Sequence, residues 1–293
     1  MPSKPGQCKV SIMMQRRFSD LRRFLAAFTL RGFPIVLALS PLVAAPARAF
    51  AGPPQAALSA FNSYCGALET RLAQQHRSQG GVLASGTSNP NADARLQRGE
   101  LIIERLTPPT GAEFQGAMLH HWRGTAFAPG VKAADLERLM KDIGAYPQHY
   151  SPQAVQSRVL SQQGDRFQVV LRVRERHIIT VVSDIAYGIA FATLDAQHGY
   201  SIARSTRISE IDSPGTSAER VLDSKQEHGF LWCLNTYWSY EERDGGVYMQ
   251  IESVQLTRSI PYGLGWVVGP FVESVPRESL EFTLHATCNA LRR

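Results

Sequence analysis

Residues 230–258 read FLWCLNTYWSYEERDGGVYMQIESVQLTR, and this stretch decides the fold. Large side chains recur at every second position before residue 241, which is typical of a strand with one buried face. The segment Asp244-Gly245-Gly246 is a strong signal for a β-hairpin turn, and residues 247–258 continue as a second strand. The stretch therefore predicts two long antiparallel strands. We expect one face of the first strand, over residues 229–242, to present Phe230, Trp232, Leu234, Thr236, Trp238 and Tyr240.

Strand signals also fill most of the chain before this hairpin, separated by turn residues such as those at 163–165. A short helix is expected around residues 136–143. A long closing helix is expected over residues 276–291, because Pro276 suits a first helical turn and Leu280, Leu284 and Cys288 follow on one face. An antiparallel sheet with one apolar face needs a cover, and this helix is the obvious one. The predicted fold class is therefore α+β, with further strands over residues 100–105, 117–127, 157–161, 167–176, 178–194 and 200–211.

Three phrases within this order of elements resemble one protein superfamily. They are residues 131–160, where a helix leads through Tyr-Pro to SRVL, the strand pair 231–258, and SVPRESL at 274–280. The chain from about residue 117 to residue 293 resembles the START-like, polyketide cyclase and lipid-transfer superfamily, also called SRPBCC or Bet v 1-like. The resemblance implies the helix-grip fold, in which a curved antiparallel sheet wraps a long C-terminal helix. It also implies a cavity for a lipid or other hydrophobic small molecule between sheet and helix, and no cofactor.

The residues expected at that cavity are large side chains of the sheet and one acid. Trp122, Tyr187 and Trp238 lie on apolar strand faces, where core and cavity wall are equally good descriptions. Glu252 shares a side of its strand with Val254, so it is either a buried acid with a shifted pKa or a salt-bridged structural acid. The superfamily has no common catalytic set, so we assign no catalytic residue. The candidate ligand-binding residues are Trp122, Tyr187, Thr236, Trp238, Tyr240 and Glu252.

The first 51 residues have the order of a secretory signal peptide. Eight Lys and Arg accompany one acid, Asp20, and an apolar run over residues 33–45 leads to the small-residue segment Ala47-Arg48-Ala49. That run is too short to cross a membrane, which takes about 20 apolar residues. We therefore expect cleavage after Ala49 or Ala51, a periplasmic or secreted protein, and no membrane span in the mature chain.

The basic character of the chain resides in this leader. The whole sequence has a formal charge of +6, but residues 52–293 hold 23 Lys and Arg against 24 Asp and Glu. A protein that binds nucleic acid needs a basic surface to displace counterions from phosphates. We therefore expect no nucleic-acid partner.

The mature chain is predicted to begin with an amphipathic helix over residues 52–78. Residues 79–98 contain many Gly, Ser and Asn and are expected to form a flexible linker to a START-like domain over residues 99–293. The helix is marginal alone in water, so it should dock on the domain or pair with a second copy in a homodimer. Cys65 and Cys288 are expected in the core, and whether either pairs with Cys233 cannot be read from the spacing. The apolar stripe of the helix is Leu58, Phe61, Cys65, Leu68 and Leu72.

The sequence holds no motif for hydrolase, nucleotide or zinc chemistry. His120 and His121 are adjacent in a strand, so they point to opposite faces and cannot bind one metal together. The glycines over residues 263–269 imitate a dinucleotide fingerprint with the wrong spacing and predict a turn. We therefore expect no metal site and no cofactor.

Three functions remain after these exclusions. The first is an exported protein that binds a hydrophobic small molecule. The second is a cavity enzyme of the cyclase or dehydratase type, in which a buried acid such as Glu252 or a histidine such as His121 transfers protons. The third is a non-catalytic envelope interaction protein that uses its N-terminal helix.

Overall fold

The structure, a computed structural model, describes residues 52–78, 82–84, 91–106, 108, 111, 114–176, 180–260 and 265–293. The expected signal peptide over residues 1–51 lies outside the described residues. So do parts of the expected linker, the start of the strand expected from residue 178, and the first two residues of the 263–269 segment.

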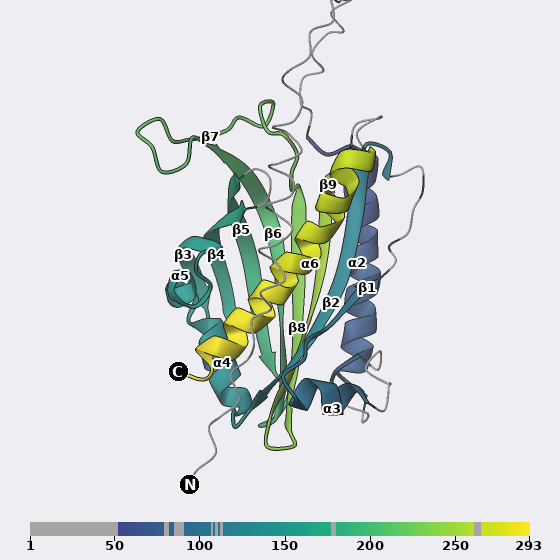
Figure 1. Cartoon of the computed structure of the whole chain (residues 1–293), viewed down its shortest axis with the longest axis vertical. Coiled ribbons are helices and arrows are strands. Elements are labelled where there is room, and N and C mark those ends of the chain that lie inside the picture. The colour runs from purple at the N-terminus through teal and green to yellow at the C-terminus, as the bar shows by residue number, and fades with distance from the viewer. Residues whose placement is uncertain are drawn as a thin grey trace, which may run out of the picture. The chain divides into compact units, whose positions relative to one another are not determined.

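In the described residues, nine strands form one antiparallel sheet (Figure 1). Eight of them lie in the order β1-β2-β9-β8-β6-β5-β4-β3, and the short β7 pairs with β6. Every expected strand is present, with ends shifted by a few residues. The strands are β1 (Ile102–Leu106), β2 (Ala117–Pro129), β3 (Ala154–Gln163), β4 (Arg166–Arg176), β5 (Thr180–Thr193), β6 (His198–Asp212), β7 (Arg220–Val221), β8 (Cys233–Arg243) and β9 (Gly246–Arg258).

The hairpin expected from the Asp-Gly-Gly segment joins β8 to β9. Arg243 pairs with Gly246, so Asp244 and Gly245 form a two-residue turn. Both turn residues have positive φ, 55° and 73°, which is the backbone that such turns require and that Asp and Gly tolerate. The turn therefore sets the register, in which Tyr237 lies opposite Glu252.

The expected start of β8 at residue 229 is wrong, because the strand begins at Cys233. The backbone N–H groups of His228, Gly229 and Phe230 donate to the carboxylate of Glu210, which is buried in β6. The backbone N–H groups of these residues are therefore paired with a side chain and not with a neighbouring strand. Phe230 consequently lies exposed and not on the expected buried face.

The helices are α2 (Gln55–Gln75), α3 (Ala92–Gln97), α4 (Ala133–Lys141), α5 (Tyr146–His149) and α6 (Gly265–Ala290), with a single 3₁₀ turn at Ile143–Ala145. The expected start of the closing helix at Pro276 is wrong, because α6 already includes Gly265. Residues 265–269 are accordingly helical and not a turn. Proline favours a first turn, but inside a helix it removes a hydrogen bond without excluding the helix.

Helix α3 was not expected, since its residues fall in the predicted linker. Leu96 of α3 is only 1% exposed and packs with Phe127 and Tyr248. Six residues carry too little periodicity to reveal a helix, and contact with the sheet stabilises this one.

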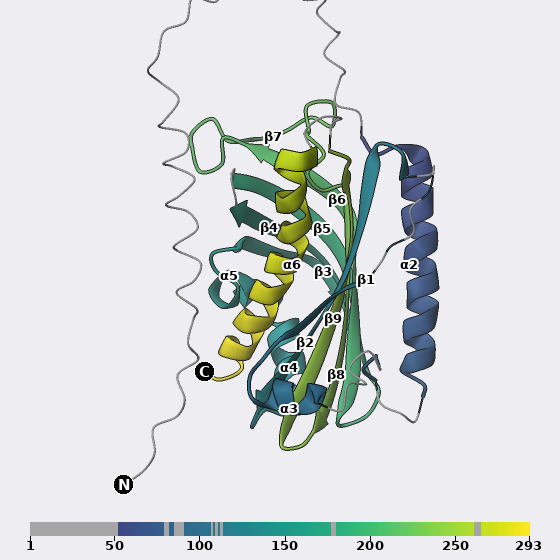
Figure 2. The same ribbon diagram turned by 45° about the vertical axis from the view of Figure 1, so that its right-hand side comes forward.

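The sheet separates two apolar cores (Figure 2). We call its two sides the α6 face, which packs against Leu280, Leu284 and Cys288, and the α2 face, which packs against the stripe of α2. Helix α6 crosses β2 at Gly124, where a Cβ atom would lie 2.6 Å from Cδ1 of Leu284. Glycine at this position therefore permits the close approach of helix and strand.

The α+β class and the helix-grip, START-like arrangement predicted from the sequence are confirmed by this architecture. The antiparallel sheet packs along α6, and α2 adds a layer on the opposite side, as Figure 2 shows. Among the described helices, none is both long and apolar enough to span a membrane.

Candidate functional site

Five of the six candidate ligand-binding residues lie on the α6 face. Trp122 of β2, Tyr187 of β5, and Trp238 and Tyr240 of β8 belong to the cluster around α6. Thr236 lies on the same side of β8 as Trp238, because it is two residues away in the strand. The structure thus brings these five residues onto one surface.

Glu252 is separated from the other five. Met249 and Ile251 of β9 pack in the α6 cluster, so Glu252 alternates to the α2 face. The register of the β8–β9 hairpin sets this side, since Glu252 pairs with Tyr237 and not with Trp238. The two-residue turn is the sequence signal that could have placed Glu252 correctly.

The α6 face is closed at one end and partly open at the other. Beside α4, Ile189, Phe191 and Tyr240 are buried, and the Tyr240 hydroxyl donates to Glu137 of α4 at 3.0 Å. Farther along the same strands, apolar side chains are only partly buried, so they offer surface on which an apolar ligand would gain free energy. These partly buried residues include Trp122, Leu171, Val173, Ala203, Leu234 and Trp238.

No Asp, Glu, Lys or Arg interrupts the middle of this face in the described strands β2, β4, β5, β6, β8 and β9. The acids on this side, Glu175, Glu210 and Glu242, stand near strand ends. Each of them accepts hydrogen bonds from neighbouring groups: Ser279 donates to Glu175, residues 228–230 to Glu210, and the Ala133 N–H to Glu242. The centre of the α6 face is therefore uncharged and suits an uncharged, apolar molecule.

A buried ionic cluster occupies the α2 face around Glu252. Nη2 of Arg71, in α2, donates to both carboxylate oxygens at 2.7 and 2.6 Å. Nε of Arg123 donates to Oε1 at 3.0 Å, and Nε2 of His121 donates to Oε2 at 2.8 Å. The hydroxyl of Tyr64, also in α2, hydrogen-bonds to Nδ1 of His121 at 2.7 Å. Two residues of α2 and three of the sheet are thus joined in one network.

This network determines the ionisation of Glu252. Burial by itself raises the pKa of the carboxyl group, but the hydrogen bond from His121 and the charges of Arg123 and Arg71 outweigh it and lower the pKa to about 2. Both oxygens are occupied by donors, and the side chain is 1% exposed. Glu252 therefore fits the second of the two roles considered from the sequence, a salt-bridged structural acid. Its ion pair with Arg71 attaches α2 to the sheet.

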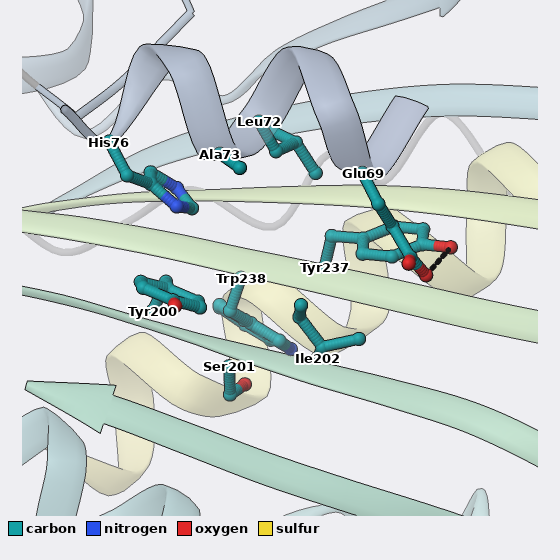
Figure 3. A pocket seen from close by; sticks show the side chains of 9 residues that line it. All are labelled: Glu69, Leu72, Ala73, His76, Tyr200, Ser201, Ile202, Tyr237 and Trp238. Atoms are coloured by element: carbon teal, nitrogen blue, oxygen red, sulfur yellow. Dashed lines mark hydrogen bonds between the residues drawn. The ribbon is translucent and has the colours of Figure 1, made fainter. Parts of the chain in front are cut away.

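A small cavity lies between α2 and the sheet, on the same face (Figure 3). Its volume of about 50 Å³ has room for one or two water molecules but not for a lipid. His76 stacks on Tyr200 with ring centroids 4.3 Å apart and hydrogen-bonds to Ser239 at 2.8 Å. Burial, together with the charge of Arg71, lowers the pKa of His76 to about 4. The lining residues are Glu69, Leu72, Ala73, His76, Tyr200, Ser201, Ile202, Tyr237 and Trp238.

Sequence reasoning missed the partners of Glu252. Arg71 and Glu252 stand 181 positions apart, and no local pattern links a helix before the domain to the last strand of the sheet. Within the described residues, no group of three or more His, Cys, Asp or Glu gathers to hold a metal ion. Cys65, Cys233 and Cys288 are free thiols, with Cys65 and Cys288 buried as expected.

The matches to known proteins are solved structures of low sequence identity. No family model matches the chain, and no curated protein matches it. It is similar to the Zhui aromatase/cyclase from Streptomyces sp. R1128 (12% identity, 60% of this chain and 95% of that chain, TM-score 0.42). It is also similar to a START superfamily protein from Mycobacterium smegmatis (14%, 59% and 97%, 0.40). A STAR-related lipid transfer protein from Xanthomonas axonopodis is similar as well (15%, 65% and 99%, 0.39).

Proposed function

We propose that this chain is an exported protein that binds a lipid or other hydrophobic small molecule between the sheet and α6. One observation carries the proposal. Apolar side chains at the centre of the α6 face, among them Ala203 and Trp238, remain only partly buried, and no charged side chain stands among them. A ligand that covered them would remove apolar surface from water at no cost in charge desolvation.

Export is the second part of the proposal and rests on the leader. The order of basic residues, apolar run and small residues in the first 51 positions is that of a signal peptide. Without that leader the chain has almost no net charge, which suits a carrier of uncharged molecules.

The two alternative functions have no comparable support. The cavity enzyme needs an acid or a histidine beside the ligand, but Glu252 and His121 lie on the α2 face and bind one another. The envelope interaction protein, and the homodimer, need the stripe of α2 to be free. That stripe packs against the sheet of its own chain.

A small-to-large substitution on the α6 face tests whether the ligand binds there. Ala203 lies at the centre of the α6 face, and Ala186 lies on β5 with its side chain on the opposite face. The neutral fluorescent probe N-phenylnaphthylamine should bind the purified protein. Ala203→Trp should weaken this binding by roughly tenfold or more, because the indole takes the place of the ligand. The matched variant Ala186→Trp should leave the affinity unchanged.

Two outcomes would contradict the proposal. One is a wild-type protein that binds neither the probe nor any lipid found by mass spectrometry of an extract of the purified protein. The other is that Ala203→Trp and Ala186→Trp change the affinity for the probe by the same factor, while thermal unfolding shows that both variants are folded. Such a result would place the probe away from the α6 face.

A further inference from the structure

The hydroxyl of Tyr187 has no hydrogen-bond partner among the described residues. Four tyrosines are buried in the described part of the chain: Tyr187, Tyr237, Tyr240 and Tyr248. Tyr237 donates to Glu69, Tyr240 to Glu137 and Tyr248 to Asp244. Tyr187 is 7% exposed, and its hydroxyl makes no hydrogen bond with any described residue. A buried hydroxyl normally has a partner, so this exception needs an explanation.

The side chain of Tyr187 lies on the α6 face, among the apolar residues that the proposed ligand would contact. Tyr187 stands in β5 between Ile185 and Ile189, and all three side chains belong to the cluster around α6. Burial raises the pKa of this phenol.

The backbone beside Tyr187 is irregular. Ala186 pairs with Arg207 of β6, but Tyr187 pairs with Ser205, so Thr206 is an extra residue in β6. Such a bulge bends a strand and changes the direction of nearby side chains, and bulges are over-represented beside binding sites. The Thr206 hydroxyl donates to the Ala186 carbonyl at 3.2 Å and so occupies a backbone acceptor at the bulge.

Two further donors on the same face have no partner in the described part of the chain. The indole N–H groups of Trp122 and Trp238 make no hydrogen bond with described residues, and both side chains are only partly buried. The unpartnered groups of the three large aromatic residues are thus able to donate, and no cationic side chain stands at the centre of the face. A ligand that complements this surface supplies an acceptor and carries no negative charge, because a buried anion would have no counter-charge.

We propose that the ligand of the α6 face is a neutral apolar molecule with a carbonyl oxygen, such as an ester or a ketone, and that this oxygen accepts a hydrogen bond from Tyr187. The proposal rests on the proposed function and narrows its ligand class. The proposed ligand differs from a plain hydrocarbon, which would offer the Tyr187 hydroxyl no acceptor. It also differs from an ionised fatty acid, which would bring a negative charge onto the uncharged face.

Competition among three ligands of similar chain length tests the proposal. Methyl laurate, dodecane and laurate each displace N-phenylnaphthylamine from the wild-type protein and from Tyr187→Phe at neutral pH. In the wild type, methyl laurate should compete best. Tyr187→Phe should weaken methyl laurate by roughly two- to tenfold, the range for one neutral hydrogen bond, and leave dodecane unchanged. The matched variant Tyr200→Phe removes a hydroxyl on the α2 face and should change neither.

Thermal unfolding of the ligand-free protein gives an independent readout. Removing a buried hydroxyl without a partner should leave the melting temperature of Tyr187→Phe unchanged or higher, whereas removing a hydrogen-bonded hydroxyl would lower it. The inference is overturned if laurate competes best, if Tyr187→Phe leaves the preference for methyl laurate intact, or if the variant is clearly destabilised. If the probe does not bind the wild type at all, the proposed function itself fails and the inference falls with it.

Discussion

Glu252 links the N-terminal helix to the sheet through charge and hydrogen bonds. It is 1% exposed and lies within hydrogen-bond distance of Arg71, Arg123 and His121. Removing one partner of a buried ion pair leaves the others desolvated and uncompensated, which costs more than the pair itself contributes. At the scale of single residues, this side chain therefore matters most for the attachment of α2.

We expect Glu252→Gln to lower the free energy of unfolding by about 3 kcal/mol at neutral pH. Glu100→Gln is the matched control, because Glu100 pairs with Arg95 and Arg98 on the surface. That variant should change stability little, since exposed pairs contribute little. Urea unfolding of both variants measures the difference, and equal stabilities would contradict the structural role of Glu252.

The difference should also depend on pH in a defined direction. The pKa of Glu252 is about 2 in the folded protein, below the ordinary value of 4.5 that applies when unfolded. The stabilisation is therefore complete above pH 4.5 and disappears as the pH falls towards 2. The wild type should accordingly lose its advantage over Glu252→Gln within that interval. An advantage that persisted at pH 2 would show that the carboxylate charge is not its source.

At the scale of elements, the contact between α6 and β2 depends on one glycine. The Cβ atom of an alanine at position 124 would lie 2.6 Å from Leu284 and 3.1 Å from Leu280, both in α6. Leu284 is fully buried, so it has little room to move. The helix and the strand would have to separate.

We expect Gly124→Ala to destabilise the protein by about 1–3 kcal/mol, the usual cost of overpacking. Gly144→Ala is the control, because a Cβ atom there meets nothing within 4 Å and the backbone is compatible with alanine. Thermal unfolding compares the two variants. If they behave alike, α6 does not lie as closely on β2 as the structure indicates.

At the scale of the whole molecule, the basic residues among the first 51 positions account for the basic isoelectric point near 9.3. If the chain is exported, cleavage removes this charge and leaves a nearly neutral protein. The full-length chain expressed in a Gram-negative host should therefore appear in the periplasmic fraction without its first 49–51 residues. Intact mass spectrometry measures the new N-terminus. A cytoplasmic protein that keeps residues 1–49 would contradict export.

Local patterns in the sequence determined much of the fold. Alternation along β8 and β9, with an Asp-Gly turn between them, specifies a hairpin because side chains on a strand change face at every residue. The stripe of α2 likewise predicts a helix that must be covered on one side. These patterns each span only a few residues, so they can be recognised in a single sequence.

Contacts between distant residues decided the rest. The sequence around Glu252 would look the same whether its side chain faced a ligand or an arginine. Its partner Arg71 lies 181 positions away in the chain. Cys233 begins β8 because a distant acid, Glu210, binds the N–H groups before it, and α3 is helical because it packs on the sheet. Only the folded chain brings such groups together, since their interactions form after the local elements have been placed. For the same reason, only the tertiary structure shows that no described residue hydrogen-bonds to the hydroxyl of Tyr187.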